Sequence, residues 1–129
     1  MAISYLISLE EFSVLAHFCG YDSFPSMPQL PVIDREKSDL LINNLVKRGM
    51  IHIHNNEAAV DLALSYVLSV MVEPINVIKG GDGTGYCGKD VWISVKTDRR
   101  NLPEMQKYKI TPFPSKEELY QWICVNEEV

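Results

Sequence analysis

Residues 40–54 read LLINNLVKRGMIHIH, and this stretch decides the fold. Its first part carries apolar residues that share one face at helical spacing, namely Leu41, Ile42, Leu45 and Val46. Gly49 suits the left-handed conformation that ends many helices, and the alternation that follows it is typical of a strand. We therefore expect a helix over residues 35–48, capped by Asp34, and a strand over residues 50–54.

Downstream of this unit, the chain turns and enters another helix. The two asparagines at 55–56 favour a tight turn, because asparagine tolerates positive φ. Asp61 can cap a helix over residues 62–72 that is apolar on nearly every side. We expect that helix to be covered almost all round.

Upstream, the chain begins with a helix and a proline-rich connector. Ser8 and the glutamate three residues later form a capping box for a helix that Gly20 ends. Residues 21–33 then carry proline at every third position at 25, 28 and 31, which excludes a helix. An extended connector is expected there.

The second half of the chain is richer in strands. We expect strands over residues 75–78, 91–95 and 108–113, with a flexible glycine-rich loop over 80–88. Ser115 and Glu118 repeat the capping-box pattern before a short terminal helix. The chain is therefore expected to form a single α+β domain over residues 1–129. Its winged-helix-like N-terminal half (1–74) is followed by a small antiparallel sheet and a C-terminal helix (75–129).

Composition favours a globular chain over a disordered or collagen-like one for most of the length. The net charge is −5 and hydrophobic residues make up 47% of the 129 residues, which is typical of one globular domain. The three cysteines are widely spaced and form no CxxC pair, which favours a reduced, cytoplasmic protein. No export signal is evident, and residues 62–72 are too few to span a bilayer. We expect no membrane association.

Two motifs are typical of nucleotide binding and of metal binding, but the residues around them do not fit these functions. Residues 83–88 fit GxGxxG, yet a dinucleotide site needs a helix after these glycines, and here a strand is expected. His52 and His54 would share one strand face, as metal ligands can, but no third ligand is near them in sequence. His17 is expected to be partly buried, and Cys87 has no base beside it. We therefore expect no catalytic residues, no metal site and no cofactor.

Residues 35–57 resemble the second helix and wing of winged helix-turn-helix proteins. The resemblance rests on the run from Leu40 to Ile51, which is similar to the LxxLxxxGLI pattern of many bacterial regulators. It implies a recognition helix that contacts DNA. The candidate nucleic-acid contacts are Asn43, Asn44, Lys47, Arg99 and Arg100. Acidic and apolar residues share the outward face of that helix, namely Glu36, Asp39 and Leu40, so nucleic acid is the second hypothesis.

The first hypothesis is a non-catalytic protein-interaction module that binds another protein or a second copy of itself. An apolar Leu40 on a polar helix face, the helix over 62–72 and the connector supply more docking surface than a small monomer needs. The candidate partner contacts are Phe24, Met27, Leu40, Asn43, Asn44 and Lys47.

A second resemblance supports this hypothesis. The order of elements is similar to that of the cytoplasmic chaperones of bacterial type VII secretion. The similar motifs are an LxxEEFxxLxxxLG-like helix from Leu9 to Gly20, an L..RGLI-like end from Leu45 to Ile51, and a PSxEEL run from Pro114 to Leu119. This resemblance implies an adaptor or chaperone-like accessory protein of a secretion system.

Overall fold

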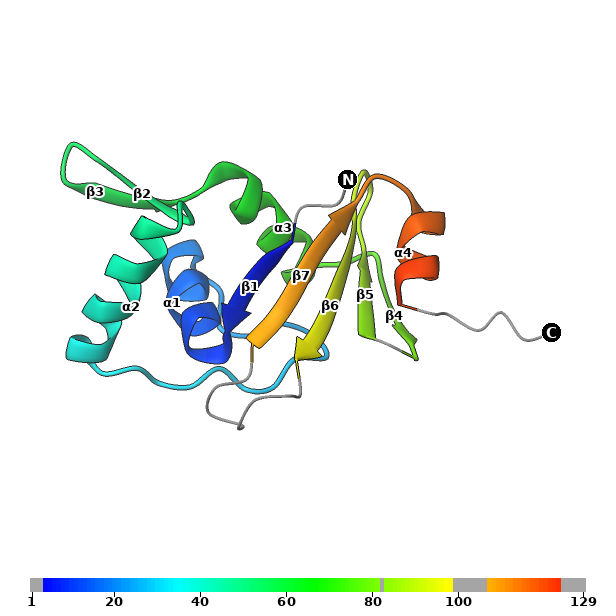
Figure 1. Cartoon of the computed structure of the whole chain (residues 1–129), viewed down its shortest axis with the longest axis horizontal. Coiled ribbons are helices and arrows are strands. Elements are labelled where there is room, and N and C mark those ends of the chain that lie inside the picture. The colour runs from blue at the N-terminus through cyan, green and yellow to red at the C-terminus, as the bar shows by residue number, and fades with distance from the viewer. Residues whose placement is uncertain (1–3, 82, 99–106, 124–129) are drawn as a thin grey trace.

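The computed structural model describes residues 4–81, 83–98 and 107–123. Within these residues the chain forms seven strands and four helices, an α+β fold (Figure 1). In chain order they are β1 (Tyr5–Ser8), α1 (Leu9–Cys19), α2 (Arg35–Lys47), β2 (Ile51–His54), β3 (Glu57–Val60), α3 (Leu62–Val72), β4 (Asn76–Gly80), β5 (Gly83–Cys87), β6 (Trp92–Asp98), β7 (Lys107–Phe113) and α4 (Lys116–Trp122).

The strands form one antiparallel sheet and one separate hairpin. The sheet has the order β1-β7-β6-β5-β4, and β2 pairs with β3. The sequence did not predict β1, which pairs with β7 from Tyr5 opposite Ile110 to Ser8 opposite Lys107. This pairing joins the start of the chain to a strand about a hundred residues later, and no local pattern specifies such a partner.

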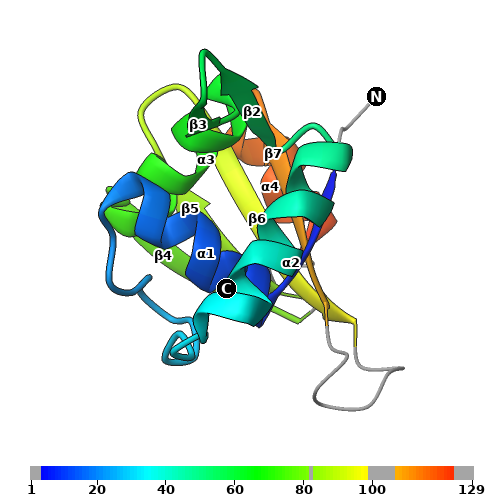
Figure 2. The same ribbon diagram turned by 90° about the vertical axis from the view of Figure 1, so that its left-hand side faces the viewer.

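Helices cover both faces of the sheet. The main core lies between the sheet and the helices α1 and α3, around Phe12, Leu68 and Ile93, while α4 packs on the opposite face (Figures 1 and 2). A second, smaller cluster under α4 joins Phe113, Leu119 and other apolar residues. The helix α2 packs against α1, so it forms an outer layer, and the β2–β3 hairpin projects beyond it.

The local signals of helix ends are confirmed. The side chains of Ser8, Asp34, Asp61 and Ser115 each accept a hydrogen bond from a backbone N–H in the first turn of their helix. Gly20 and Gly49 have positive φ values of 79° and 76° where α1 and α2 end. The turn between β2 and β3 uses Asn55 and Asn56 at φ values of 52° and 66°.

The prediction of a glycine-rich loop over 80–88 is wrong, because Gly83–Cys87 form the strand β5 in the interior of the sheet. The glycines allow α4 to approach closely. A Cβ on Gly80 would lie 2.0 Å from the carbonyl oxygen of Ile123, and one on Gly85 would lie 3.0 Å from Leu119 Cδ2. Of the GxGxxG glycines, Gly85 lies close to α4, whereas a Cβ on Gly88 would lie 2.9 Å from Val70 of α3, so these glycines reflect close packing of the sheet against its neighbours.

The prediction that the helix over 62–72 is covered almost all round is also wrong. Leu64, Val67 and Leu68 are buried in α3, but Leu62 and Tyr66 are exposed. The first turn of α3 lies on the side of the β2–β3 hairpin (Figure 1), and Leu62 there is 87% exposed within the described part of the chain.

A buried carboxylate joins β1, α1 and α2. Glu11 Oε1 accepts a hydrogen bond from the backbone N–H of Ser8 at 2.9 Å, and its Oε2 accepts from Arg48 Nη1 at 2.7 Å and from Asn44 Nδ2 at 3.1 Å. Arg48 also donates to the carbonyl oxygen of Leu6 on the free edge of β1. Glu11 and Arg48 therefore hold α2 in place and block part of a sheet edge.

Candidate interaction surface

A groove of about 720 Å³ lies between α1, the connector and α2. The residues that line it are Ser13, Val14, His17, Phe18, Tyr21, Asp22, Leu30, Pro31, Val32, Ile33, Arg35, Ser38 and Ile42. Most of these side chains are apolar, and the groove is open to solvent. Helices α1 and α2, which contribute to its walls, lie next to each other (Figure 2).

Local sequence signals build the groove. Gly20 ends α1 and releases the chain into the connector, and Asp34 starts α2. Between them the connector is tied down at two points. Ser13 Oγ donates a hydrogen bond to the carbonyl oxygen of Pro31 at 2.6 Å, and the hydroxyl of Tyr86 donates to the carbonyl oxygen of Pro25. The connector is therefore a fixed wall of the groove.

The rim of the groove exposes large apolar side chains. Val32 is fully exposed and Phe18 is 37% exposed. His17, Asp22 and Arg35 add polar groups to the lining. His17 is exposed, so the prediction that it is partly buried is wrong. Exposed apolar side chains with polar groups beside them are the arrangement of many protein-binding surfaces.

Phe24 does not belong to an exposed docking surface, contrary to the sequence prediction. Its side chain is 3% exposed, and its ring meets those of Phe12 and Tyr21 edge-on at 5.7 and 6.1 Å. Met27 is half-buried against the same core. The prolines keep the connector extended, but its chain lies against the body of the protein and turns these two side chains inward.

The outer face of α2 is exposed as predicted. Leu40 is 71% exposed, and Asn43, Asn44 and Lys47 are exposed as well. Asn44, however, donates its amide to Glu11, so its side chain holds α2 against α1. Leu40, Asn43 and Lys47 are absent from the groove lining, because they lie on the opposite side of the helix.

Of the predicted nucleic-acid contacts, the structure describes Asn43, Asn44 and Lys47, which all lie on α2. Arg99 and Arg100 lie outside the described part of the chain. The basic residues Lys96 and Lys109 contact the Trp122 ring of α4. Helices α2 and α4 lie at opposite ends of the molecule (Figure 1). These lysines therefore face away from α2.

The β2–β3 hairpin exposes both of its histidines. His52 Nε2 lies 2.8 Å from Asp61 Oδ1, and this contact lowers the pKa of Asp61. Ile51 is buried, but Ile53 is 57% exposed because the hairpin extends beyond the core. Among the residues that the structure describes, no group of three or more histidine, cysteine or acidic side chains is placed to hold a metal ion.

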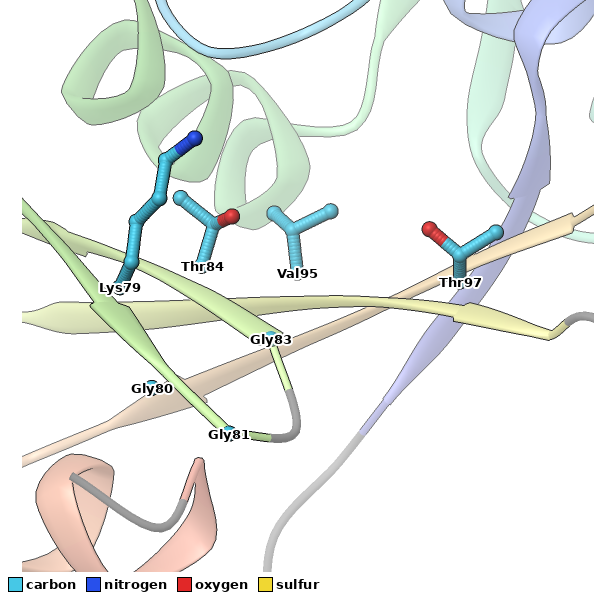
Figure 3. A pocket seen from close by; sticks show the side chains of 7 residues that line it. All are labelled: Lys79, Gly80, Gly81, Gly83, Thr84, Val95 and Thr97. Carbon is cyan, nitrogen blue, oxygen red and sulfur yellow. The ribbon is translucent and has the colours of Figure 1, made fainter. Parts of the chain in front are cut away.

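A second pocket of about 450 Å³ lies at the β4–β5 turn (Figure 3). The side chains of Lys79, Thr84, Val95 and Thr97 project from one face of the sheet, and the backbone of neighbouring glycines completes the lining. The strand β5, not a helix, follows these glycines. The backbone therefore lacks the helix N-terminus that holds phosphates in dinucleotide-binding folds.

Burial keeps the described thiols protonated. It raises the pKa of Cys87 and also of Cys19. Lys116 near Cys87 and Ser65 near Cys19 oppose this shift but do not outweigh it. Neither thiol is therefore activated as a nucleophile at neutral pH.

No protein-family model, curated protein or solved structure matches this chain. In the described part of the chain, each helix is too short or too polar to cross a bilayer. Sequence reasoning missed Phe18, Val32 and Ile33 in the lining of the groove, although the apolar run over 30–33 directly before α2 is a signal for Val32 and Ile33.

Proposed function

We propose that this protein is a protein-interaction module that binds an apolar segment of a partner in the groove between α1, the connector and α2. One observation carries the proposal. The fully exposed Val32 and the exposed Phe18 both line this groove, and its connector wall is held by a hydrogen bond from Ser13. Burial of these side chains against a partner removes apolar surface from water, which is the main driving force of such association.

A segment of a partner fits this groove better than a small molecule. The groove is a trough between two helices with apolar residues at its rim, and rim residues contact a partner that extends beyond the cavity. An apolar face of a helix, or an extended apolar strand, would contact Phe18 and Val32 together.

The finer role we propose is that of an adaptor or chaperone-like accessory protein of a bacterial secretion system, acting in the cytoplasm. Support comes from the motifs of the second resemblance. The capping box of α1, the glycine after α2 and the capping serine of α4 occur at element ends that match those motifs. A protein that shields an apolar segment of a secreted substrate requires an open apolar groove of this kind.

The test is recovery of partners from the cells that make this protein. The tagged chain is compared with the Val32→Asp variant, and bound proteins are identified by mass spectrometry after nuclease treatment. Loss of one stoichiometric partner from Val32→Asp is expected, because a carboxylate on the rim must be desolvated when the partner docks.

Leu62→Asp is the matched control, since Leu62 is also exposed and lies on α3, outside the groove. It should retain the partner. Equal recovery with Val32→Asp and the unchanged chain would refute the groove as the binding site. Leu40→Asp tests in the same way whether the partner binds to the outer face of α2.

DNA binding by α2 and the hairpin stays the second proposal. It is supported by the exposed Asn43 and Lys47 on a helix that leads directly into a β-hairpin. In a parallel pull-down without nuclease, recovery of DNA that is lost on nuclease treatment and that Lys47→Glu weakens would favour this function.

A further inference from the structure

The face of the sheet on the α4 side carries a row of cations. Lys96 on β6 lies directly opposite Lys109 on β7, and Lys109 lies directly opposite Leu6 on the edge strand β1. Directly opposed residues point to the same face, so these three side chains form one row across three strands. We call this row, together with the Trp122 ring, the lysine face.

The arrangement of the two lysines is electrostatically unfavourable without an anion. Like charges directly opposite each other destabilise a strand pair. The ammonium groups of Lys96 and Lys109 lie 4.4 and 5.3 Å from the centre of the Trp122 ring, and that contact offsets part of the repulsion. Among the residues whose side chains the structure describes, which leaves out Asp98 two positions after Lys96, no carboxylate forms an ion pair with either lysine. The whole chain has a net charge of −5.

The same region is short of hydrogen-bond acceptors. The indole nitrogen of Trp122 and the hydroxyl oxygen of Ser94 are buried, and neither has a hydrogen-bond partner among the described residues. Ser94 precedes Lys96 by two positions on β6, so it points to the same face. Because both atoms are buried, a ligand on the surface meets the two ammonium groups and not these atoms, and the charge that complements this face is negative.

We infer that the lysine face binds a short acidic segment of another protein. Two ammonium groups in one compact cluster match a pair of carboxylates, and Leu6, which is 46% exposed, offers an apolar contact at the end of the row. A nucleic acid is a weaker match, because its dense charge extends far beyond two lysines and meets the net negative charge of the rest of the chain. The inference does not depend on the groove and goes beyond the proposed function.

The experiment measures binding of a fluorescein-labelled octaglutamate peptide by fluorescence anisotropy, with a labelled oligothymidine as the comparison. We expect the peptide to bind at low ionic strength and to weaken as salt is added. Lys109→Glu should lower the affinity about tenfold, since it removes one attraction and adds a repulsion. Lys109→Arg keeps the charge and should bind as the unchanged chain does.

Lys79→Glu is the matched control, because Lys79 is exposed on the other face of the sheet. It should leave peptide affinity unchanged, and so should the groove variant Val32→Asp. Lys109→Gln serves in place of Lys109→Glu if the charge reversal disturbs folding. Absence of peptide binding, equal losses in Lys79→Glu and Lys109→Glu, or preferential binding of oligothymidine would each overturn the inference.

Discussion

Replacement of Glu11 by alanine should destabilise the protein far more than the same change at the adjacent Glu10. Only 5% of the Glu11 side chain is exposed, and its carboxylate serves the capping box of α1 as well as Arg48 and Asn44 of the α2 region. Glu10 is 33% exposed and pairs with Lys37 at the surface. The two variants remove the same atoms from neighbouring positions of one helix turn.

The magnitude follows from these contacts. Loss of the capping interaction costs about 1 kcal/mol. Removal of one partner from a fully buried ion pair costs about 3–5 kcal/mol, but Arg48 is 28% exposed and regains water, so we expect about 2 kcal/mol from this source. The free energy of unfolding should therefore fall by about 3 kcal/mol.

Urea unfolding followed by circular dichroism measures this change. At an m-value of about 1.5 kcal/mol per molar urea, the midpoint should fall by about 2 M. Glu10→Ala should shift it far less, because exposed pairs are screened by solvent. Arg48→Ala added to Glu11→Ala should cost less than the sum of the two single changes, since both remove one shared contact. Equal midpoints for Glu10→Ala and Glu11→Ala would refute the reasoning.

Two further predictions concern α4 and the cap of α3. Gly80→Ala should detach α4, because the new Cβ would lie 2.0 Å from the Ile123 carbonyl oxygen. Acrylamide should then quench the tryptophan fluorescence more strongly than in the unchanged chain. Unchanged quenching would contradict this prediction. The hydrogen bond from His52 lowers the pKa of Asp61, so this carboxylate stabilises the fold above its unfolded pKa of about 4 and loses that effect as pH falls. Asp61→Asn should therefore reduce the free energy of unfolding at pH 7 and have less effect on it at pH 3. An equal reduction at the two pH values would contradict this prediction.

The sequence by itself determined the features that depend on neighbouring residues. The caps of the helices, the left-handed glycines at 20 and 49 and the asparagine turn of the hairpin all formed as predicted. Each depends on hydrogen bonds or backbone angles within a few residues, so its signal is present in a short window of sequence. The periodicity of residues 41–46 likewise placed Leu40 and Lys47 on the exposed side of α2.

Only the tertiary structure decided which segments meet. Gly83–Cys87 form a strand because β4 and β6 pair with them on either side, and β1 forms because β7 offers it a partner. Phe24 is buried since the connector lies against the core, and the same path exposes Val32 at the groove. These outcomes depend on contacts between residues far apart in the chain, which composition and spacing do not encode. The groove and the lysine face therefore became visible only once the chain was folded.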